Sequence, residues 1–209
     1  MCETGRGSGG KGVIRAEILK PNRNRIYRYQ LGEKPRSFLS FPEFYDSMNR
    51  RKQKRSYLVQ QGIHLLKKKG RPFDVRVMVQ RTEAHPWTVT GMLGRLAHPK
   101  RIVTNYHSGG RPPPLNRLLQ PQLRGPANRS YMTKLEKLSI KIANHLQQSY
   151  RGFREIGVDF GIDSRMRPWV LEVNTAPDAF VFNQLKDKRM FRKVLRYARA
   201  NGRYRKAKR

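Results

Sequence analysis

The sequence predicts an α+β protein in which antiparallel sheets and helices occupy separate layers. Residues 71–80 alternate apolar and polar side chains, as a strand does, and residues 130–150 repeat apolar side chains at helical spacing. The predicted strands also follow one another in pairs joined by turn signals, rather than alternating with helices. Together these patterns favour hairpins over crossover connections.

The first part of the chain predicts a hairpin, then a helix and a strand. Proline and asparagine separate the two hairpin strands, and the helix has Pro42 and acids in its first turn and basic residues in its last. The next strand is interrupted by Gln60, Gln61 and Gly62. The expected strands are 13–18, 25–31 and 57–66, and the expected helix is 41–55.

The second part predicts a sheet with two helices. In residues 71–80, one face carries Phe73, Val75, Val77 and Val79, and the other carries Asp74, Arg76, Met78 and Gln80. Further strands are expected at 87–97, 155–163 and 168–174, a structured loop at 98–125, a helix at 130–150 capped by Ser130, and a final helix before a basic, disordered tail at 201–209.

Composition limits the class of protein. The 209 residues are 37% hydrophobic, which is enough for a core, and the single Cys2 excludes a disulfide framework and a cysteine-based zinc site. The five histidines show no metal-ligand spacing. No apolar run is long enough for a membrane span or a signal peptide, so we expect a soluble, cytoplasmic protein.

The charge is strongly basic, with 46 Lys and Arg against 14 acids and a formal net charge of +32. Such a balance indicates polyanionic partners: nucleic acid, an anionic polymer, a membrane surface or phosphate-rich small molecules. A generally basic surface without a specific partner explains it equally well. The sequence contains no zinc finger, RNA-recognition signature or evident helix-turn-helix.

Glu172 is the acid that needs an explanation, because it interrupts an apolar strand. Alternation places Trp169, Leu171 and Val173 on one face, and Glu172 and Asn174 on the other. A hairpin that turns through 164–167 puts Asp159 opposite Glu172, with the two carboxylates roughly 5 Å apart.

Two arrangements relieve the repulsion between these acids. Mg²⁺ takes one or two protein carboxylates, and Asn174 adds a neutral oxygen. Alternatively, arginines neutralise both acids, and Arg76 and Arg95 come from interior strands. The glycine-rich segment 5–13 offers backbone N–H groups and Lys11 to a phosphate chain, although it is not a Walker loop and equally suits a flexible tail.

These motifs, in this order, resemble the ATP-grasp superfamily, and most closely its YheC/YheD-type branch, which is associated with bacterial endospore coats. The resemblance extends from about Gly5 to Phe182. It rests on GSGGKGV, YLVQQGI, PFDVRVMVQ, VTGMLGRLA, TNYHSGG, GVDFGID and WVLEVNTAP.

The resemblance implies two lobes with antiparallel sheets that enclose ATP: a small lobe at 1–62 with the glycine-rich loop, and a C-terminal lobe at 63–200 with a metal site. Asp159, Glu172 and Asn174 would hold Mg²⁺. Arg76 and Arg95 would be catalytic. The nucleotide would contact Lys11, Gln60, Gln61, Ile63, Arg76 and Asn105.

The implied reaction activates a carboxylate substrate as an acyl phosphate, which an amine or thiol then attacks. Family members usually carry a further domain before the glycine loop, whereas only Met1–Thr4 precede it here, so we expect this pre-grasp region to be absent. The alternatives are a nucleotide-binding spore-coat component without turnover, and a basic protein that binds nucleic acid or an anionic polymer.

Overall fold

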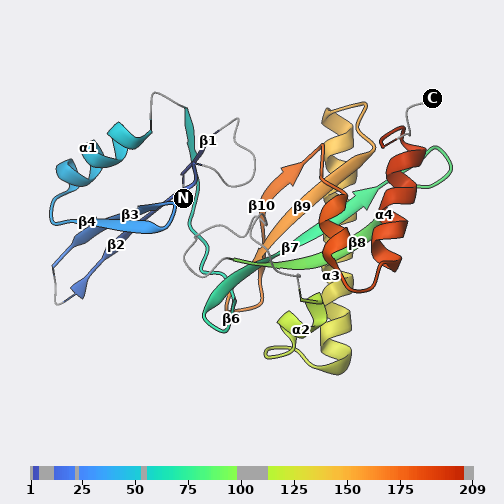
Figure 1. Cartoon of the computed structure of the whole chain (residues 1–209), viewed down its shortest axis with the longest axis horizontal. Coiled ribbons are helices and arrows are strands. Elements are labelled where there is room, and N and C mark those ends of the chain that lie inside the picture. The colour runs from blue at the N-terminus through green and yellow to red at the C-terminus, as the bar shows by residue number, and fades with distance from the viewer. Residues whose placement is uncertain (1, 5–11, 22–23, 53–55, 98–112, 205–209) are drawn as a thin grey trace. The chain divides into compact units, whose positions relative to one another are not determined.

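The computed structural model describes residues 2–4, 12–21, 24–52, 56–97 and 113–204. The chain divides into two compact units (Figure 1). One comprises Met1–Ile63 and Ala97–Ser108, and the other comprises His64–Leu96 and Gly109–Arg209. Each unit has its own sheet.

The first unit is an antiparallel sheet with one helix, in the strand order β4-β3-β2-β1-β5. The predicted hairpin is confirmed, and the predicted strand at 57–66 is shorter than expected. Ser40 caps the helix by accepting a hydrogen bond from the Glu43 N–H (3.4 Å). The elements are β1 (Cys2–Thr4), β2 (Ile14–Leu19), β3 (Ile26–Leu31), β4 (Lys34–Phe38), α1 (Phe41–Arg51) and β5 (Tyr57–Val59).

The second unit is built on a sheet with the order β10-β9-β7-β6, in which β8 also pairs with β7. All of these pairings are antiparallel. The α+β class is therefore confirmed. The strands are β6 (Lys67–Lys68), β7 (Arg71–Gln80), β8 (Thr88–Leu96), β9 (Glu155–Ile162) and β10 (Pro168–Asn174).

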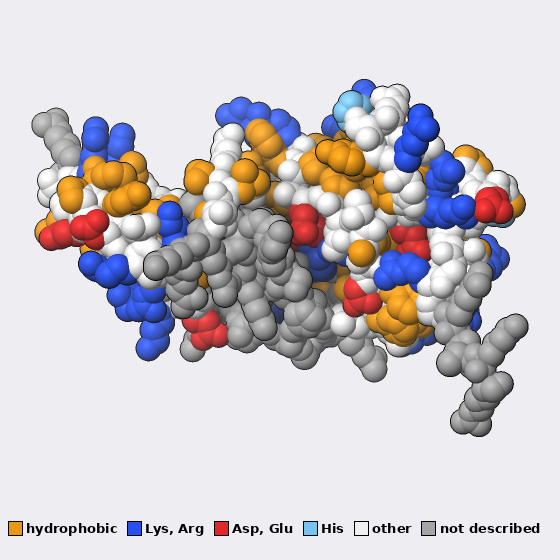
Figure 2. Space-filling model, turned by 90° about the horizontal axis from the view of Figure 1, so that it is seen from above, with side chains coloured by type: hydrophobic (Ala, Val, Ile, Leu, Met, Phe, Trp, Pro, Cys, Tyr) orange, Lys and Arg blue, Asp and Glu red, His pale blue; other side chains and the backbone are white. Residues whose placement is uncertain are grey.

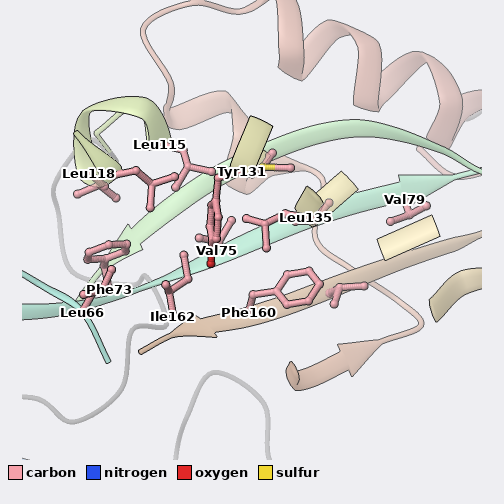
Figure 3. Close-up of a cluster of buried hydrophobic side chains, with 14 of the residues drawn as sticks. Leu66, Phe73, Val75, Val79, Leu115, Leu118, Tyr131, Leu135, Phe160 and Ile162 are labelled. Carbon is pink, nitrogen blue, oxygen red and sulfur yellow. The ribbon is translucent and has the colours of Figure 1, made fainter. Parts of the chain in front are cut away.

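Helices cover both faces of this second sheet. The helices α2 (Leu115–Leu119) and α3 (Gly125–Ser149) pack on the face that carries Phe73 and Val75, where they form the main core (Figure 3). The 3₁₀ helix η2 (Phe180–Gln184) and α4 (Arg189–Ala200) pack on the opposite face, against Met78 and Leu93. Because both faces are covered, every residue of β9 is buried.

Three expectations need correction. The predicted loop at 98–125 contains α2, because Leu115, Leu118 and Leu119 bury their side chains. The helix predicted at 130–150 begins at Gly125, so Ser130 lies inside it and does not cap it.

The third correction concerns the tail predicted at 201–209, of which residues 201–204 are ordered. Arg203 donates hydrogen bonds to the buried Glu155 (3.1 Å) and to the Pro177 carbonyl (3.0 Å), and Tyr204 packs edge-on against Phe180. Residues 201–204 have no apolar periodicity, and these contacts with distant residues fix their position instead. Residues 205–209 lie outside the described part. Among the described residues, none of the helices has the length and apolar character that a membrane span requires.

Candidate active site

Four charged side chains lie on one face of β7, β8 and β9 in the second unit. Asp74 is 2% exposed, Arg76 7%, Arg95 5% and Asp159 3%. Strand register brings them together, because Arg76 lies opposite Asp159 and Asp74 lies opposite Arg95. Alternation along β7 places Asp74 and Arg76 away from the apolar core, as predicted. We call these four residues the ionic network.

The arginines bind the carboxylates in paired geometry. Both Nε and Nη2 of Arg76 donate to the Asp159 carboxylate, the latter at 2.9 Å. Arg95 donates to the Asp74 carboxylate through Nε at 2.8 Å and through Nη2 at 2.5 Å. The Arg95 Nη2 also lies 2.8 Å from Asp159 Oδ2. Asp159 is therefore held between two guanidinium groups.

The network is electrically balanced, with two cations and two carboxylates. Buried charges are costly unless they are paired and hydrogen-bonded, and here each is paired. Burial alone lowers the pKa of Arg95, but the carboxylates of Asp74 and then Asp159 outweigh this effect and raise that pKa above its usual value. Arginine neutralisation, one of the two arrangements expected from the sequence, is thus present at Asp159.

Glu172 differs from Asp159 although the two lie opposite each other. The register of β9 and β10 confirms the predicted cross-strand pair. Glu172 is exposed, and no ion pair joins it to any other residue that the structure describes. Asn174 lies on the same strand, and its Oδ1 accepts a hydrogen bond from the Ala176 N–H (2.8 Å). Glu172 is thus an exposed carboxylate without a described ion-pair partner, and it lies opposite Asp159, which two arginines already bind.

A β-bulge adjusts this strand pair. The register shifts between Val170 and Glu172, so an extra residue, Leu171, is accommodated there. Leu171 lies against Gly161, with its side-chain carbons 3.1 and 3.3 Å from where a Gly161 Cβ would be. Because Gly161 and Asp159 share a face, Leu171 lies on the carboxylate side. The prediction that Leu171 faces away from Glu172 is therefore wrong.

Trp169 also departs from its predicted apolar face. It pairs with Gly161, and its indole N–H donates to Asp163 (3.0 Å). Asp163 also accepts hydrogen bonds from the backbone N–H groups of Arg165 and Arg167 and from the Arg167 guanidinium. Burial alone raises the pKa of Asp163, but these bonds outweigh it and hold that pKa below its usual range. Asp163 therefore organises the β9–β10 turn.

Two glycines flank Asp159 where other side chains approach the strand closely: Arg76 and Pro177 at Gly157, and Leu65 and Leu171 at Gly161. A Cβ at Gly157 would lie 3.1 Å from Arg76 Nη1 and 2.9 Å from the Pro177 side chain. A Cβ at Gly161 would lie 2.6 Å from the Leu65 side chain. The Gly-x-Asp-x-Gly pattern within GVDFG is the sequence signal that could have indicated this close approach. Asp74 was likewise missed as a site residue, although it shares a strand face with Arg76.

The remaining predicted nucleotide contacts belong to the first unit or are not described. Gln60, Gln61 and Ile63 follow β5 without regular structure, and the boundary between the two units falls directly after Ile63. Lys11 and Asn105 lie outside the described residues. Their contacts with a nucleotide beside the ionic network therefore stay a prediction.

The donor set limits which metal the site could hold. The described residues contain no cluster of three or more His, Cys, Asp or Glu side chains suited to a metal. Asp159, Glu172 and Asn174 offer at most two carboxylates and one amide oxygen, which suits Mg²⁺ because this ion keeps several waters and takes phosphate oxygens. They do not suit a closed zinc site.

Comparisons with known proteins identify the family of a sequence range that includes this sheet. The model of the YheC/D-like ATP-grasp family matches residues 4–200. The chain is 31% identical to endospore coat-associated protein YheD of Bacillus subtilis (strain 168) over 129 residues, which are 61% of this chain and 28% of that protein. It is 22% identical to endospore coat-associated protein YheC of the same organism over 173 residues, which are 82% of this chain and 47% of that protein.

The chain thus spans less than half the length of these two relatives. A solved structure, the C-terminal domain of Pby1 from K. lactis, is described as an ATP-grasp enzyme that interacts with the mRNA decapping enzyme Dcp2. It aligns with a TM-score of 0.40 and 17% identity, covering 78% of this chain and 51% of that one. Because the family match runs through nearly all of the sequence, the chain belongs to the YheC/D-like ATP-grasp family.

Proposed function

We propose that this protein binds Mg²⁺-ATP and acts as an ATP-dependent ligase that activates a carboxylate substrate as an acyl phosphate. The observation that carries the proposal is the open carboxylate of Glu172 opposite Asp159, beside two buried arginines, in a chain of the ATP-grasp family. An exposed carboxylate with no ion-pair partner among the described residues is suited to hold a metal ion.

Asp159, Glu172 and Asn174 are the residues that would hold Mg²⁺. When bound, Mg²⁺ supplies charge neutralisation for the phosphates of ATP. Asp159 would contact the metal while it still accepts hydrogen bonds from the guanidinium groups of Arg76 and Arg95. The paired geometry already holds these groups in place. Glu172 needs no rearrangement, since no described residue pairs with it.

Arg76 and Arg95 would stabilise negative charge on the transferred phosphoryl group. Each uses Nε and Nη2 for the carboxylates, and the Nη1 group of each makes no hydrogen bond with a described residue. These N–H donors are therefore available to an anion. A guanidinium fixed in advance by carboxylates costs little reorganisation during the reaction. Lys11, Gln60, Gln61, Ile63 and Asn105 are further proposed nucleotide contacts.

The substitution Glu172→Gln tests the metal role, because it keeps the side-chain shape and removes one charge. We expect the affinity for Mg²⁺-ATP to fall at least tenfold, measured by isothermal titration calorimetry. Without metal, the melting temperature should stay the same or rise slightly, since a like-charge pair has been removed. A much less stable variant that still binds Mg²⁺-ATP normally would show that Glu172 is a structural residue.

Glu83→Gln provides the matched control. Glu83 is an exposed acid paired with Arg154 at 3.0 Å, far along the chain from β10, so the same chemical change should leave nucleotide affinity intact. If both variants weaken binding equally, the effect is a general loss of negative charge and the metal assignment is wrong.

A second candidate is a nucleotide-binding component of the endospore coat that does not turn over ATP. The names of both curated relatives favour a coat association. Release of ADP distinguishes the candidates: a ligase should release ADP when supplied with its carboxylate substrate and an amine or thiol, whereas a coat component should bind ATP and release none. Screening carboxylates and acceptors for stimulated ADP release by a coupled assay tests this.

A further inference from the structure

A second potential binding region lies in the second unit, apart from the ionic network. A groove of about 1260 Å³ is lined by residues of α2, of the first turns of α3, of the segment that leads into α4, and of β8. None of the four network residues lines it. This volume exceeds the roughly 300–1,000 Å³ typical of small-molecule pockets. The groove therefore suits an extended chain better than a compact ligand.

The floor of the groove is apolar and adaptable. It contains three methionines, Met92, Met132 and Met190, which come from β8, α3 and α4. Leucines line it as well, and Leu123 and Leu185 are only half-buried. Methionine side chains are flexible and polarisable, so they accommodate apolar side chains of varied shape.

The rim of the groove is cationic. Arg117, Arg124, Arg129 and Lys186 are exposed, and no ion pair joins any of them to a described residue. Asp187 is the one acid among the described lining residues. Hydrogen bonds from Arg189 hold the pKa of Asp187 below its usual value and occupy its carboxylate.

The start of α3 adds to this positive potential. The helix has no side-chain cap and no acid in its first turn, so its N–H groups and dipole favour negative charge there. The rim and the helix start together select an anionic occupant.

Two polar groups in the wall indicate a polypeptide occupant. Asn128 is 7% exposed, and its Oδ1 has no hydrogen-bond donor, whereas its Nδ2 donates to the carbonyls of Asn116 and Leu123. The Met92 N–H of β8 donates to the sulfur of Met190 (3.2 Å), which is a weak acceptor. A peptide backbone carries both the N–H and the carbonyl that these groups lack.

We infer that this groove binds an extended acidic polypeptide segment that carries apolar side chains. A second copy of the chain is a poor occupant, because its net charge is +32 and Lys and Arg side chains crowd the face seen in Figure 2. A nucleic acid is a poor occupant because the described lining residues include no aromatic side chain to stack on its bases. The inference does not depend on nucleotide binding.

The test uses a fluorescent peptide in which glutamate alternates with leucine, measured by anisotropy with the full chain at near-physiological salt. Arg117→Gln combined with Arg129→Gln should weaken binding about tenfold, since each exposed cation contributes roughly threefold. The control combines Arg196→Gln with Arg199→Gln on the exposed face of α4, outside the groove, and removes the same charge. It should change binding less than twofold.

Four results overturn the inference. The acidic peptide binds too weakly to measure, or both double variants weaken it equally, which shows diffuse attraction to a basic surface. Alternatively, a peptide with glutamine in place of glutamate binds as well as the acidic one. A single-stranded oligonucleotide serves as the competing probe. If the Arg117→Gln, Arg129→Gln variant binds this oligonucleotide more weakly and the control variant does not, the groove binds nucleic acid instead. Mg²⁺-ATP affinity should be unchanged in both variants, which separates this test from that of the proposed function.

Discussion

The substitution Asp159→Asn isolates the structural contribution of the ionic network. Asp159 is 3% exposed and accepts hydrogen bonds from Arg76 and Arg95. Asparagine keeps the shape but presents an amide donor to one of the two guanidinium groups and leaves one buried positive charge unbalanced. Removing one partner from a buried ion pair costs about 3–5 kcal/mol. For a chain of this size, this corresponds to a fall of about 10 °C in melting temperature.

A surface carboxylate in the same chain provides the comparison. Glu17 also lies between two arginines, with Arg15 at 2.7 Å and Arg28 at 2.5 Å, but its side chain is 23% exposed and both arginines reach solvent. Solvent screens such pairs, so Glu17→Gln should cost only about 0.5 kcal/mol. The two substitutions therefore remove the same pairing at different burial.

Urea denaturation without nucleotide or metal measures both variants, followed by circular dichroism. Tryptophan fluorescence adds a signal specific to the second unit, because Trp87 and Trp169 both belong to it. If Asp159→Asn costs less than about 1 kcal/mol, or no more than Glu17→Gln, the network is effectively solvated and its burial does not matter.

Three further predictions concern the surroundings of the network. Arg203→Gln should lower stability by about 2–3 kcal/mol in urea melts, because the buried Glu155 loses its cation; no change would show that this C-terminal contact is weak. Gly157→Ala should cost about 1–3 kcal/mol because its Cβ would crowd Arg76, and a neutral effect would refute the close approach. The carboxylate of Asp163 has a lowered folded-state pKa, so its contribution to stability is present above about pH 4 and lost as the pH falls below that value. Asp163→Asn should therefore destabilise the protein at pH 7 and much less near pH 2, and an equal loss at both values would contradict the assignment.

The sequence alone predicted most of the sheet that carries the candidate site. Alternation over 71–80 assigned Arg76 to the polar face of β7, because a strand has a strict period of two and one face must meet the core. The turn at 164–167 predicted the hairpin and the pair of Asp159 with Glu172, but the register beside the turn differs by one residue from the predicted one. The bulge at Leu171 restores that pair.

Only the tertiary structure decided which acids are neutralised. The pairing of Asp74 with Arg95 depends on the register between β7 and β8, and the distance along the chain between these strands leaves that register open. The bulge at Leu171 depends on the space beside Gly161, which Leu65 helps to define. The docking of Arg203 requires Glu155, a partner distant in the sequence. Period and turn length are local properties that a sequence displays directly, whereas these contacts arise from packing between segments brought together by folding.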